Sequence, residues 1–383
     1  MNNFSFENPT KIIFGKGSIA QLSTEIPSVK RILITFGGGS VKRNGIYEQV
    51  MAALQGHFTV EFWGIEPNPE YGTLLKAAEL AKANSVDFLL AVGGGSVLDG
   101  TKFISQAMVY DGEPWDIVKN PSLAQPSYPV ASVMTLPATG SEMNHRCVVS
   151  YREKGDKLSF MSRYLYPKFS ILDPEVAYSL PKQQLTNGVV DSFIHVMEQY
   201  LTYPVNAMLM DRWAEGLLMT MIELGPKVVS EGRNYEVMSN YMLCATMALN
   251  EFISMGVPQD WATHRVGQEL TVLYGLDHGQ TLALLYPSLL KRLKQEKFQK
   301  LLQYAERVWA INDGTDDEKV DVVIVRTEEF FRSLGMKTRF SEYGIGEEAI
   351  EQIVAQVKKR GLNYGEHKSV TPEVVREIVR MAL

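Results

Sequence analysis

The sequence predicts an α/β domain with a parallel sheet, followed by an all-α domain. Up to about residue 180, short runs rich in Val, Ile and Leu alternate with amphipathic stretches, which is typical of a parallel sheet with helices on its faces. Beyond that point, apolar residues recur at spacings of three and four, as on one face of a helix. A chain of 383 residues also exceeds what one hydrophobic core usually fills. We therefore expect domains over residues 1–180 and 181–383.

The elements follow from the same periodicities. The apolar runs that predict strands cover residues 31–36, 86–92 and 130–136. The first two runs are followed by amphipathic stretches near 47–54 and over 97–108, and a turn of small residues ends each run. The helical patterns of the second domain cover residues 182–201, 207–224, 234–253, 261–273 and 298–311. Because ligands of parallel sheets bind at the carboxyl ends of the strands, we expect the turns to form a binding site.

Composition excludes several classes of protein. The 38 Lys and Arg residues against 44 Asp and Glu give a net charge of −6, which argues against a surface for nucleic acid or for anionic lipid. No apolar run approaches the roughly 18 residues that span a bilayer, and the first residues do not resemble a signal peptide. Cys147 and Cys244 are too few for a disulfide framework or a cysteine metal cage. We expect a cytoplasmic protein that is neither exported nor embedded.

The turn Gly93-Gly94-Gly95-Ser96 follows the second predicted strand, with Asp99 and Lys102 just beyond it. Such a turn lets the backbone approach a phosphate, and the amides of the following helix point at the anion. An ordinary tight turn between a strand and a helix would use the same residues, and the six-residue dinucleotide fingerprint is not matched. Both interpretations remain open from the residues alone.

A second small-residue turn, residues 37–40, bears on the choice of nucleotide. No carboxylate follows its strand until Glu48, whereas an Asp or Glu there would bind the ribose hydroxyls of NAD and repel the 2′-phosphate of NADP. This absence, with Ser40, Lys42 and Arg43 nearby, favours NADP. A surface turn with solvated basic residues fits the spacing equally well.

Four residues have the chemistry of a metal site. Asp191 and His195 lie four apart in a helical pattern, so the carboxylate and the imidazole project from the same face. His264 lies on a later predicted helix, and His278 follows a break at Gly275. One carboxylate and three imidazoles would bind Fe(II) or Zn(II) and leave a position open. A helix salt link and hydrogen-bonded core histidines are the alternative.

These motifs occur together in the order and spacing of a known family. They are Gly93-Gly94-Gly95-Ser96 with Asp99 and Lys102, the turn from Thr135 to Glu142, Asp173-Pro174, and then Asp191, His195, His264 and His278. From about Pro9 to its C-terminus, the chain resembles the iron-containing (group III) alcohol dehydrogenases. It is most similar, over residues 36–42 and 256–264, to their branch of NADPH-dependent aldehyde reductases and butanol dehydrogenases.

The resemblance implies a dinucleotide-binding domain over residues 1–180, a helical metal-binding domain over 181–383, the fold shared with dehydroquinate synthases, and a homodimer. It implies that the catalytic residues are the metal ligands Asp191, His195, His264 and His278. It implies that NADP(H) is bound by Gly38, Gly39, Ser40, Gly94, Gly95, Ser96, Asp99, Thr135, Thr139, Ser141 and Lys157. The first three of these would receive the 2′-phosphate.

The chain departs from the family pattern at two places. Many members carry a second histidine one helical turn after the third ligand, where this chain has Gln268, so a proton relay through that position is in doubt. The turn at Thr135 is also shorter than the commoner version with an extra Ala-Gly pair, a feature that the reductase branch shares. His145 matches no family ligand, and we interpret it as a surface or loop histidine.

The expected reaction is hydride transfer between NADP(H) and short- or medium-chain aldehydes or primary alcohols, with one Fe(II) or Zn(II) ion as Lewis acid. No side chain has to act as a nucleophile. A dehydroquinate-synthase-like lyase shares the architecture, but it would need a dense Lys and Arg cluster and a ligand set led by Glu. A non-catalytic protein that binds the cofactor is a further alternative.

Overall fold

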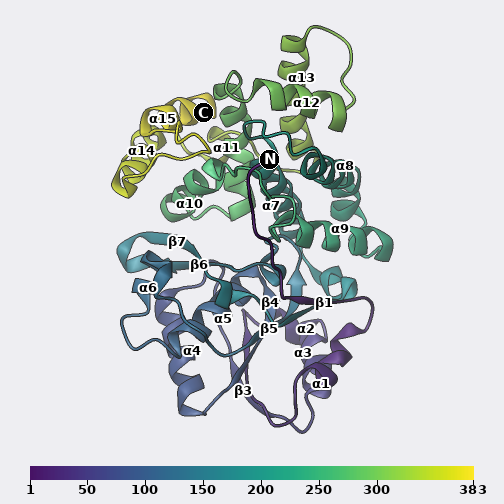
Figure 1. Cartoon of the computed structure of the whole chain (residues 1–383), viewed down its shortest axis with the longest axis vertical. Coiled ribbons are helices and arrows are strands. Elements are labelled where there is room, and N and C mark those ends of the chain that lie inside the picture. Colours follow the sequence, from purple (N-terminus) through teal and green to yellow (C-terminus); the bar gives the residue numbers. More distant parts are fainter. The chain divides into compact units, whose positions relative to one another are not determined.

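A six-stranded, wholly parallel sheet forms the first part of the chain. The structure, a computed structural model, describes all 383 residues (Figure 1). The strands lie in the order β1-β8-β5-β4-β2-β3. Their bounds are β1 Lys11–Phe14, β2 Arg31–Phe36, β3 Phe58–Phe62, β4 Phe88–Gly94, β5 Val130–Leu136 and β8 Phe169–Leu172. The prediction of a parallel α/β part followed by a helical part is confirmed.

Helices follow the strands as the alternating pattern predicts. They are α1 Leu22–Glu25, α2 Ser40–Arg43, α3 Ile46–Ala53, α4 Tyr71–Ala83, α5 Gly95–Ala107 and α6 Trp115–Lys119. The central strands are buried on both faces, which explains why they read as continuous apolar runs in the sequence. β2 pairs with β4 and β4 with β5, in registers that join Phe36 to Val92 and Gly93 to Met134. The turns that follow these three strands therefore lie next to one another at one edge of the sheet.

A separate hairpin, β6 Arg146–Tyr151 with β7 Asp156–Met161, is antiparallel and was not expected from the sequence. It contacts α4, α5 and α6. The Tyr151 ring lies against Tyr71 and Trp115 at centroid distances of 4.8 and 5.2 Å. These aromatic contacts attach the hairpin to the sheet layer, which an apolar pattern along one strand cannot reveal.

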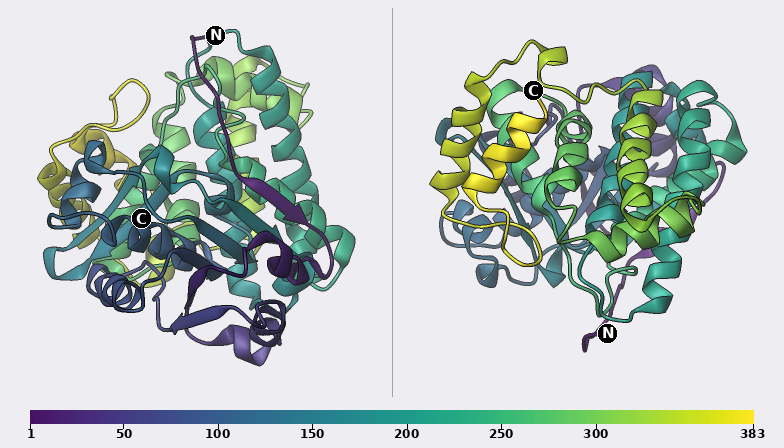
Figure 2. Two further views of the ribbon diagram at one scale, coloured as in Figure 1. Left: turned by 60° about the horizontal axis from the view of Figure 1, so that its bottom comes forward. Right: turned by 90° about the horizontal axis from the view of Figure 1, so that it is seen from above.

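The second part of the chain is helical. Its helices are α7 Lys182–Tyr200, α8 Met208–Ser230, α9 Tyr235–Ala248, α10 Ala262–Tyr274, α11 His278–Arg292, α12 Phe298–Val308, α13 Asp316–Ser333, α14 Glu348–Arg360 and α15 Pro372–Met381. α7 is surrounded by other elements, because all its residues from Gly188 to Tyr200 are buried. α8 and α11 pack along it, and Figure 2 shows α14 and α15 side by side near the C-terminus.

The chain divides into two compact units that exchange short segments. One unit comprises residues 7–181 and 232–246, and the other comprises 1–6, 182–231 and 247–383. The helix expected over 234–253 ends at Ala248. Its end has a local cause, since the Asn250 side chain accepts from the backbone N–H of Phe252 and so competes with helical hydrogen bonding.

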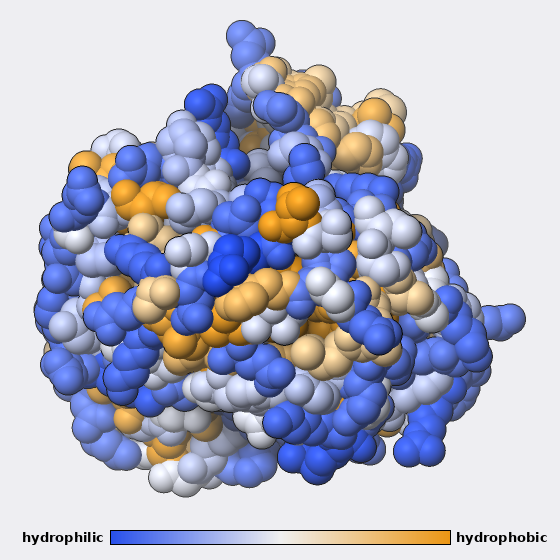
Figure 3. Space-filling model, turned by 90° about the horizontal axis from the view of Figure 1, so that it is seen from below, coloured by the Kyte–Doolittle hydropathy of each residue, from blue (hydrophilic) through white to orange (hydrophobic).

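No helix combines the length and the hydropathy that crossing a membrane requires. The face drawn in Figure 3 is mostly hydrophilic, with apolar side chains gathered in patches between charged and polar ones.

A pair of glycines tests the close packing of α11 on α7. A Cβ on Gly279 would lie 2.6 Å from the backbone oxygen of Asn187, whereas a Cβ on Gly216, inside α8, would meet nothing within 4 Å. We expect Gly279→Ala to destabilise the protein by about 1–3 kcal/mol, because backbone atoms must move apart. Gly216→Ala should stabilise it by about 0.5–1 kcal/mol, since Ala restricts the unfolded chain. Thermal unfolding midpoints measure both, and a Gly279→Ala midpoint at or above the wild-type value would contradict this packing.

Candidate metal centre

α7 supplies two of the candidate ligands. Its apolar residues Val190, Phe193 and Ile194 are fully buried, and this burial fixes the direction in which Asp191 and His195 project. Both polar side chains are themselves buried, at 4% exposure. His195 Nε2 lies 3.4 Å from Asp191 Oδ1, as expected for residues one helical turn apart.

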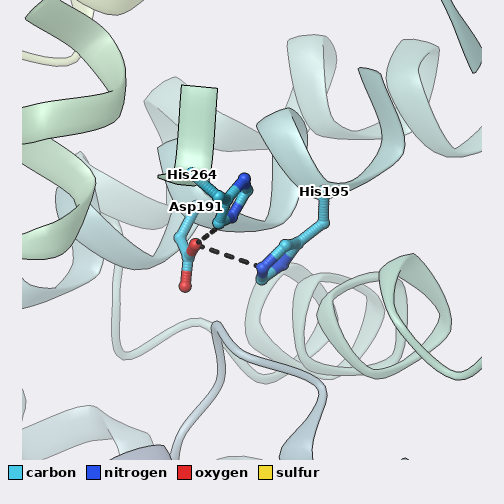
Figure 4. Close-up of side chains that lie close together, drawn as sticks. All are labelled: Asp191, His195 and His264. Atoms are coloured by element: carbon cyan, nitrogen blue, oxygen red, sulfur yellow. Dashed lines mark ion pairs between the residues drawn. The ribbon is translucent and has the colours of Figure 1, made fainter. Parts of the chain in front are cut away.

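The other two candidate ligands lie at the starts of two further helices. His264 is the third residue of α10, and its Nε2 lies 3.6 Å from Asp191 Oδ1. His278 is the first residue of α11, whose start is stabilised by a capping box of Asp277 and Gln280. His278 Nε2 lies 3.5 Å from the same oxygen of Asp191. The structure therefore places a nitrogen of each of the three predicted histidines within 3.6 Å of Asp191 Oδ1, and the ligand atoms of Asp191, His195 and His264 all lie within 4.8 Å of one another. Figure 4 shows Asp191 facing His195 and His264.

The geometry fits a divalent cation. Bonds of about 2.0–2.1 Å in a tetrahedral arrangement separate neighbouring ligand atoms by about 3.4 Å, close to the three nitrogen–oxygen distances around Asp191. Asp191 Oδ1 and His264 Nε2 are buried and form no hydrogen bond. Buried polar atoms without a hydrogen-bond partner are rare, and a bound ion is one explanation for them. The donor set of one carboxylate and imidazoles suits Fe(II) or Zn(II).

The electrostatics of the cluster favour positive charge between its members. Burial alone would raise the pKa of Asp191, but the neighbouring histidines outweigh it and hold that pKa well below its usual range. Burial alone would lower the pKa of His264, but the carboxylates of Glu198 and Asp191 raise it to about 9. The arrangement thus attracts a proton or a cation to the space between Asp191 and the imidazoles.

Glu198 is a functional residue that the sequence analysis missed. Its Oε2 contacts His264 Nδ1, and its Oε1 accepts a hydrogen bond of 2.6 Å from Thr263 N. A carboxylate on the second nitrogen of a ligating imidazole orients the ring and fixes its tautomer. The spacing of Asp191, His195 and Glu198 along one face of α7 was the signal that could have revealed it.

The residues predicted for a nucleotide lie in the sheet unit. Gly94 ends β4 and Gly95 begins α5, where a Cβ would approach Thr139 Oγ1 to 2.4 Å. The glycine at 95 is therefore required by the close approach of the turn after β5, whether or not a phosphate binds there. Ser96 Oγ accepts a hydrogen bond from Asn68 N at 3.3 Å.

The side chains beyond the glycine turn are tied to the turn after β5. Ser141 Oγ donates to Asp99 Oδ1 at 2.6 Å, and Val148 N donates to Asp99 Oδ2 at 2.9 Å. Lys102, which is fully buried, donates to the backbone oxygens of Ser141, Asn144 and Arg146 at 2.7–2.9 Å. Burial lowers the Lys102 pKa to about 8, against the raising effect of Asp99. Both carboxylate oxygens of Asp99 thus bind the protein itself.

The other predicted nucleotide residues occupy three places. Gly38 and Gly39 lie between β2 and α2, where Gly39 has a φ of 88° that favours glycine, and Ser40 is the first residue of α2. Lys42 follows them, and its ammonium lies 4.1 Å from the centroid of the Trp63 ring. The last two predicted residues are Thr135, half-buried at the end of β5, and Lys157, buried on β7.

His145, which matches no family ligand, and Gln268, which replaces a histidine of many family members, both lie in the described structure. His145 is half-buried, and its ring lies 4.9 Å from the ring of Tyr166. Gln268 is buried on α10, one turn after His264. The amide side chain of Gln268 cannot take up and release a proton near neutral pH, as an imidazole can.

Comparison with known proteins covers nearly the whole chain. The model of the iron-containing alcohol dehydrogenases matches residues 9–174, and the model of the C-terminal part of that family matches residues 185–383. The NADPH-dependent aldehyde reductase YqhD of Escherichia coli is 50% identical, and the alignment covers 100% of both chains. The probable NADH-dependent butanol dehydrogenase 1 of Bacillus subtilis is 39% identical, again with 100% of both chains covered.

Solved structures agree with these matches. The crystal structure of YqhD from E. coli K-12 superposes with a TM-score of 0.98 at 49% identity, covering 100% of this chain and 99% of that one. The NADH-dependent butanol dehydrogenase A of Thermotoga maritima superposes with a TM-score of 0.95 at 33% identity, covering 100% and 99% of the two chains.

Glu198→Gln tests the support of His264. The amide cannot hold the imidazole as a carboxylate does, so we expect the affinity for Zn(II) to fall by about 10–100-fold. Competition with a chromogenic chelator measures this affinity. Glu215→Gln is the matched control, because Glu215 is an equally buried carboxylate that pairs with Arg307 instead. Equal Zn(II) affinities of the two variants would show that Glu198 does not support the metal centre.

Proposed function

This chain belongs to the iron-containing alcohol dehydrogenase family, and we propose that it transfers hydride between NADP(H) and short- or medium-chain aldehydes or primary alcohols. The observation that carries the proposal is the approach of three imidazole nitrogens to Asp191 Oδ1 at 3.4–3.6 Å. A relative of 50% identity is named as an NADPH-dependent aldehyde reductase. We assign the catalytic role to the same four residues, Asp191, His195, His264 and His278.

The side chains of the cluster would create the environment for this reaction. When bound, the ion would polarise the aldehyde carbonyl and the nicotinamide would supply the hydride. His278 is the most accessible member, with 28% of its side chain exposed, whereas Asp191 and His195 are almost fully covered. The open side of the cluster therefore lies next to His278, and we propose that the substrate enters there.

The turn after β2 carries the proposed preference for NADP(H). It presents Ser40 and then Lys42 and has no carboxylate that would repel a 2′-phosphate. We propose that Gly38, Gly39 and Ser40 receive this phosphate. Relatives named as NADPH-dependent and as NADH-dependent both match the chain, so their names alone do not decide the preference.

The setting of the enzyme is also a proposal. Cys147 and Cys244 are buried and form no disulfide, which supports a reducing cytoplasm. We propose a homodimer, and sedimentation of the purified protein would test it. Asp191 stands where the lyase alternative would require Glu, which disfavours that alternative.

Chelation and ligand replacement test the reaction together. We expect the protein to oxidise NADPH when butanal is added. This oxidation should stop after complete removal of the metal. His264→Ala should lower turnover by at least about 100-fold, because a Lewis acid is worth several kcal/mol. The same variant should bind NADPH like the wild type in a fluorescence titration. Turnover that survives complete metal removal would refute the proposed reaction.

Ser40→Asp tests the nucleotide preference. A carboxylate at this place would face the 2′-phosphate, and we expect the KM for NADPH to rise by about 10–100-fold because like charges repel. The KM for NADH should not rise. Ser40→Ala, which adds no charge, serves as the control. If wild-type protein used NADH as well as NADPH, the turn would not select the nucleotide.

A further inference from the structure

A buried ionic cluster lies outside the ligand set of the metal centre. Its centre is Lys297, whose ammonium lies 2.6 Å from Asp260 Oδ2 and 2.9 Å from Glu366 Oε1. The ammonium also donates to the backbone oxygen of Leu201 at 2.7 Å. The exposed fractions of the three side chains are only 3–7%, so the ammonium must offset the negative charge that the carboxylates would bury. An ammonium has three protons, and all three have acceptors here.

Asp260 connects this cluster to the start of α10. Its Oδ1 accepts from Ala262 N at 2.8 Å, and its own N–H donates to the backbone oxygen of Glu198 at 2.8 Å. Between these contacts, Trp261 adopts the left-handed conformation with a φ of 63°. A residue other than glycine keeps this conformation only where its surroundings enforce it. Asp260 is therefore placed to hold the turn that sets the direction of α10.

The turn determines where His264 lies. Thr263 N donates to Glu198 Oε1 at 2.6 Å, and the ring of Trp261 contacts the rings of His195 and His264 edge-on at 6.1 and 5.2 Å. A change in the Trp261 turn would shift His264 with respect to the ligands on α7.

Lys297 also reaches the far ends of the other two ligand helices. Leu201, whose oxygen it binds, immediately follows α7, which carries Asp191 and His195. The backbone N–H of Lys297 donates to the oxygen of Leu293, the residue after α11. The first residue of α11 is His278. Lys297 thus contacts the end of α7 through its side chain and the end of α11 through its backbone N–H, and its partner Asp260 contacts the beginning of α10.

We propose that Lys297, together with Asp260 and Glu366, is a positioning centre that holds the ligand-bearing helices in the arrangement that binds the metal. Glu366 belongs to the loop between α14 and α15, so this loop is part of the centre. The loop is closed on itself by the pairing of Tyr364 with Val370. The proposal rests on the four-ligand site proposed above and adds residues that touch neither the metal nor the substrate.

Lys297→Met tests the proposal by metal binding rather than by turnover. We expect the affinities for Zn(II) and Co(II), measured by chelator competition on the full chain, to fall by about 10–100-fold. The visible bands of the Co(II)-loaded protein should also change, since they report coordination geometry. Lys297→Arg, which restores the charge, should recover part of the affinity.

Lys300→Met is the matched control. Lys300 lies on α12, is 5% exposed, and pairs at 2.7 Å with Asp211, whose side chain is 21% exposed, so its loss removes a buried ammonium from a partly buried ion pair. We expect it to lower the thermal midpoint of the metal-free protein as Lys297→Met does, but to leave metal affinity and the Co(II) spectrum unchanged. A fall in metal affinity of the same size in both variants would show a general loss of stability and overturn the proposal.

A second variant keeps the test decisive if Lys297→Met fails to fold. Asp260→Asn has the same size and retains an acceptor for Ala262 N, but it loses the charge that pairs with Lys297. Reduced metal affinity in folded Asp260→Asn supports the positioning role, and wild-type affinity overturns it. These measurements need no substrate. A wild-type protein that binds metal but reduces no aldehyde would contradict the proposed function without contradicting the positioning role of Lys297.

Discussion

Burial of the Asp191 carboxylate is the constraint on which the helical unit depends. An ionised carboxylate that has lost its water must be compensated by opposite charge or by strong hydrogen bonds. Three imidazoles from α7, α10 and α11 come within 3.6 Å of one of its oxygens and supply that compensation. Only one of them, His195, is placed by the helix that carries Asp191. The other two require that separate helices begin at defined points in space.

The structure meets this requirement with further buried charges. Glu198 holds the His264 ring, and the pairing of Lys297 with Asp260 holds the turn before it. Buried ion pairs often add little stability compared with apolar packing, because desolvation offsets their attraction. Their directionality is a better explanation for their presence here, since hydrogen-bonded charges define the start of α10 in a way that apolar contacts do not.

The sheet unit also contains a buried lysine whose ammonium binds backbone oxygens. Lys102 is as deeply buried as Lys297, and it binds backbone oxygens along the turn after β5. This turn carries Thr139 and Ser141, and Thr139 packs directly on Gly95. In each unit, one buried ammonium therefore organises irregular backbone whose polar groups would otherwise lack partners.

Local periodicity was enough to predict the parallel sheet, the helices α7 to α10 and α12, and the shared helix face of Asp191 and His195. It did not predict α11 or the helices α13 to α15. The predicted features depend on residues within a few positions of one another, as does the glycine turn after β4. The hairpin β6–β7, the role of Glu198 and the cluster around Lys297 could not be predicted in this way. Glu198 and His264 are 66 residues apart, and Lys297 and Glu366 are 69 apart.

Residue types and spacing by themselves therefore determined which side chains could bind a metal and that two of them share a face of α7. Only the tertiary structure decided that the three imidazoles approach Asp191 and which carboxylates support them. The physical reason is that pairing between charges depends on distance in space and on burial, and the chain sets both only when its helices pack.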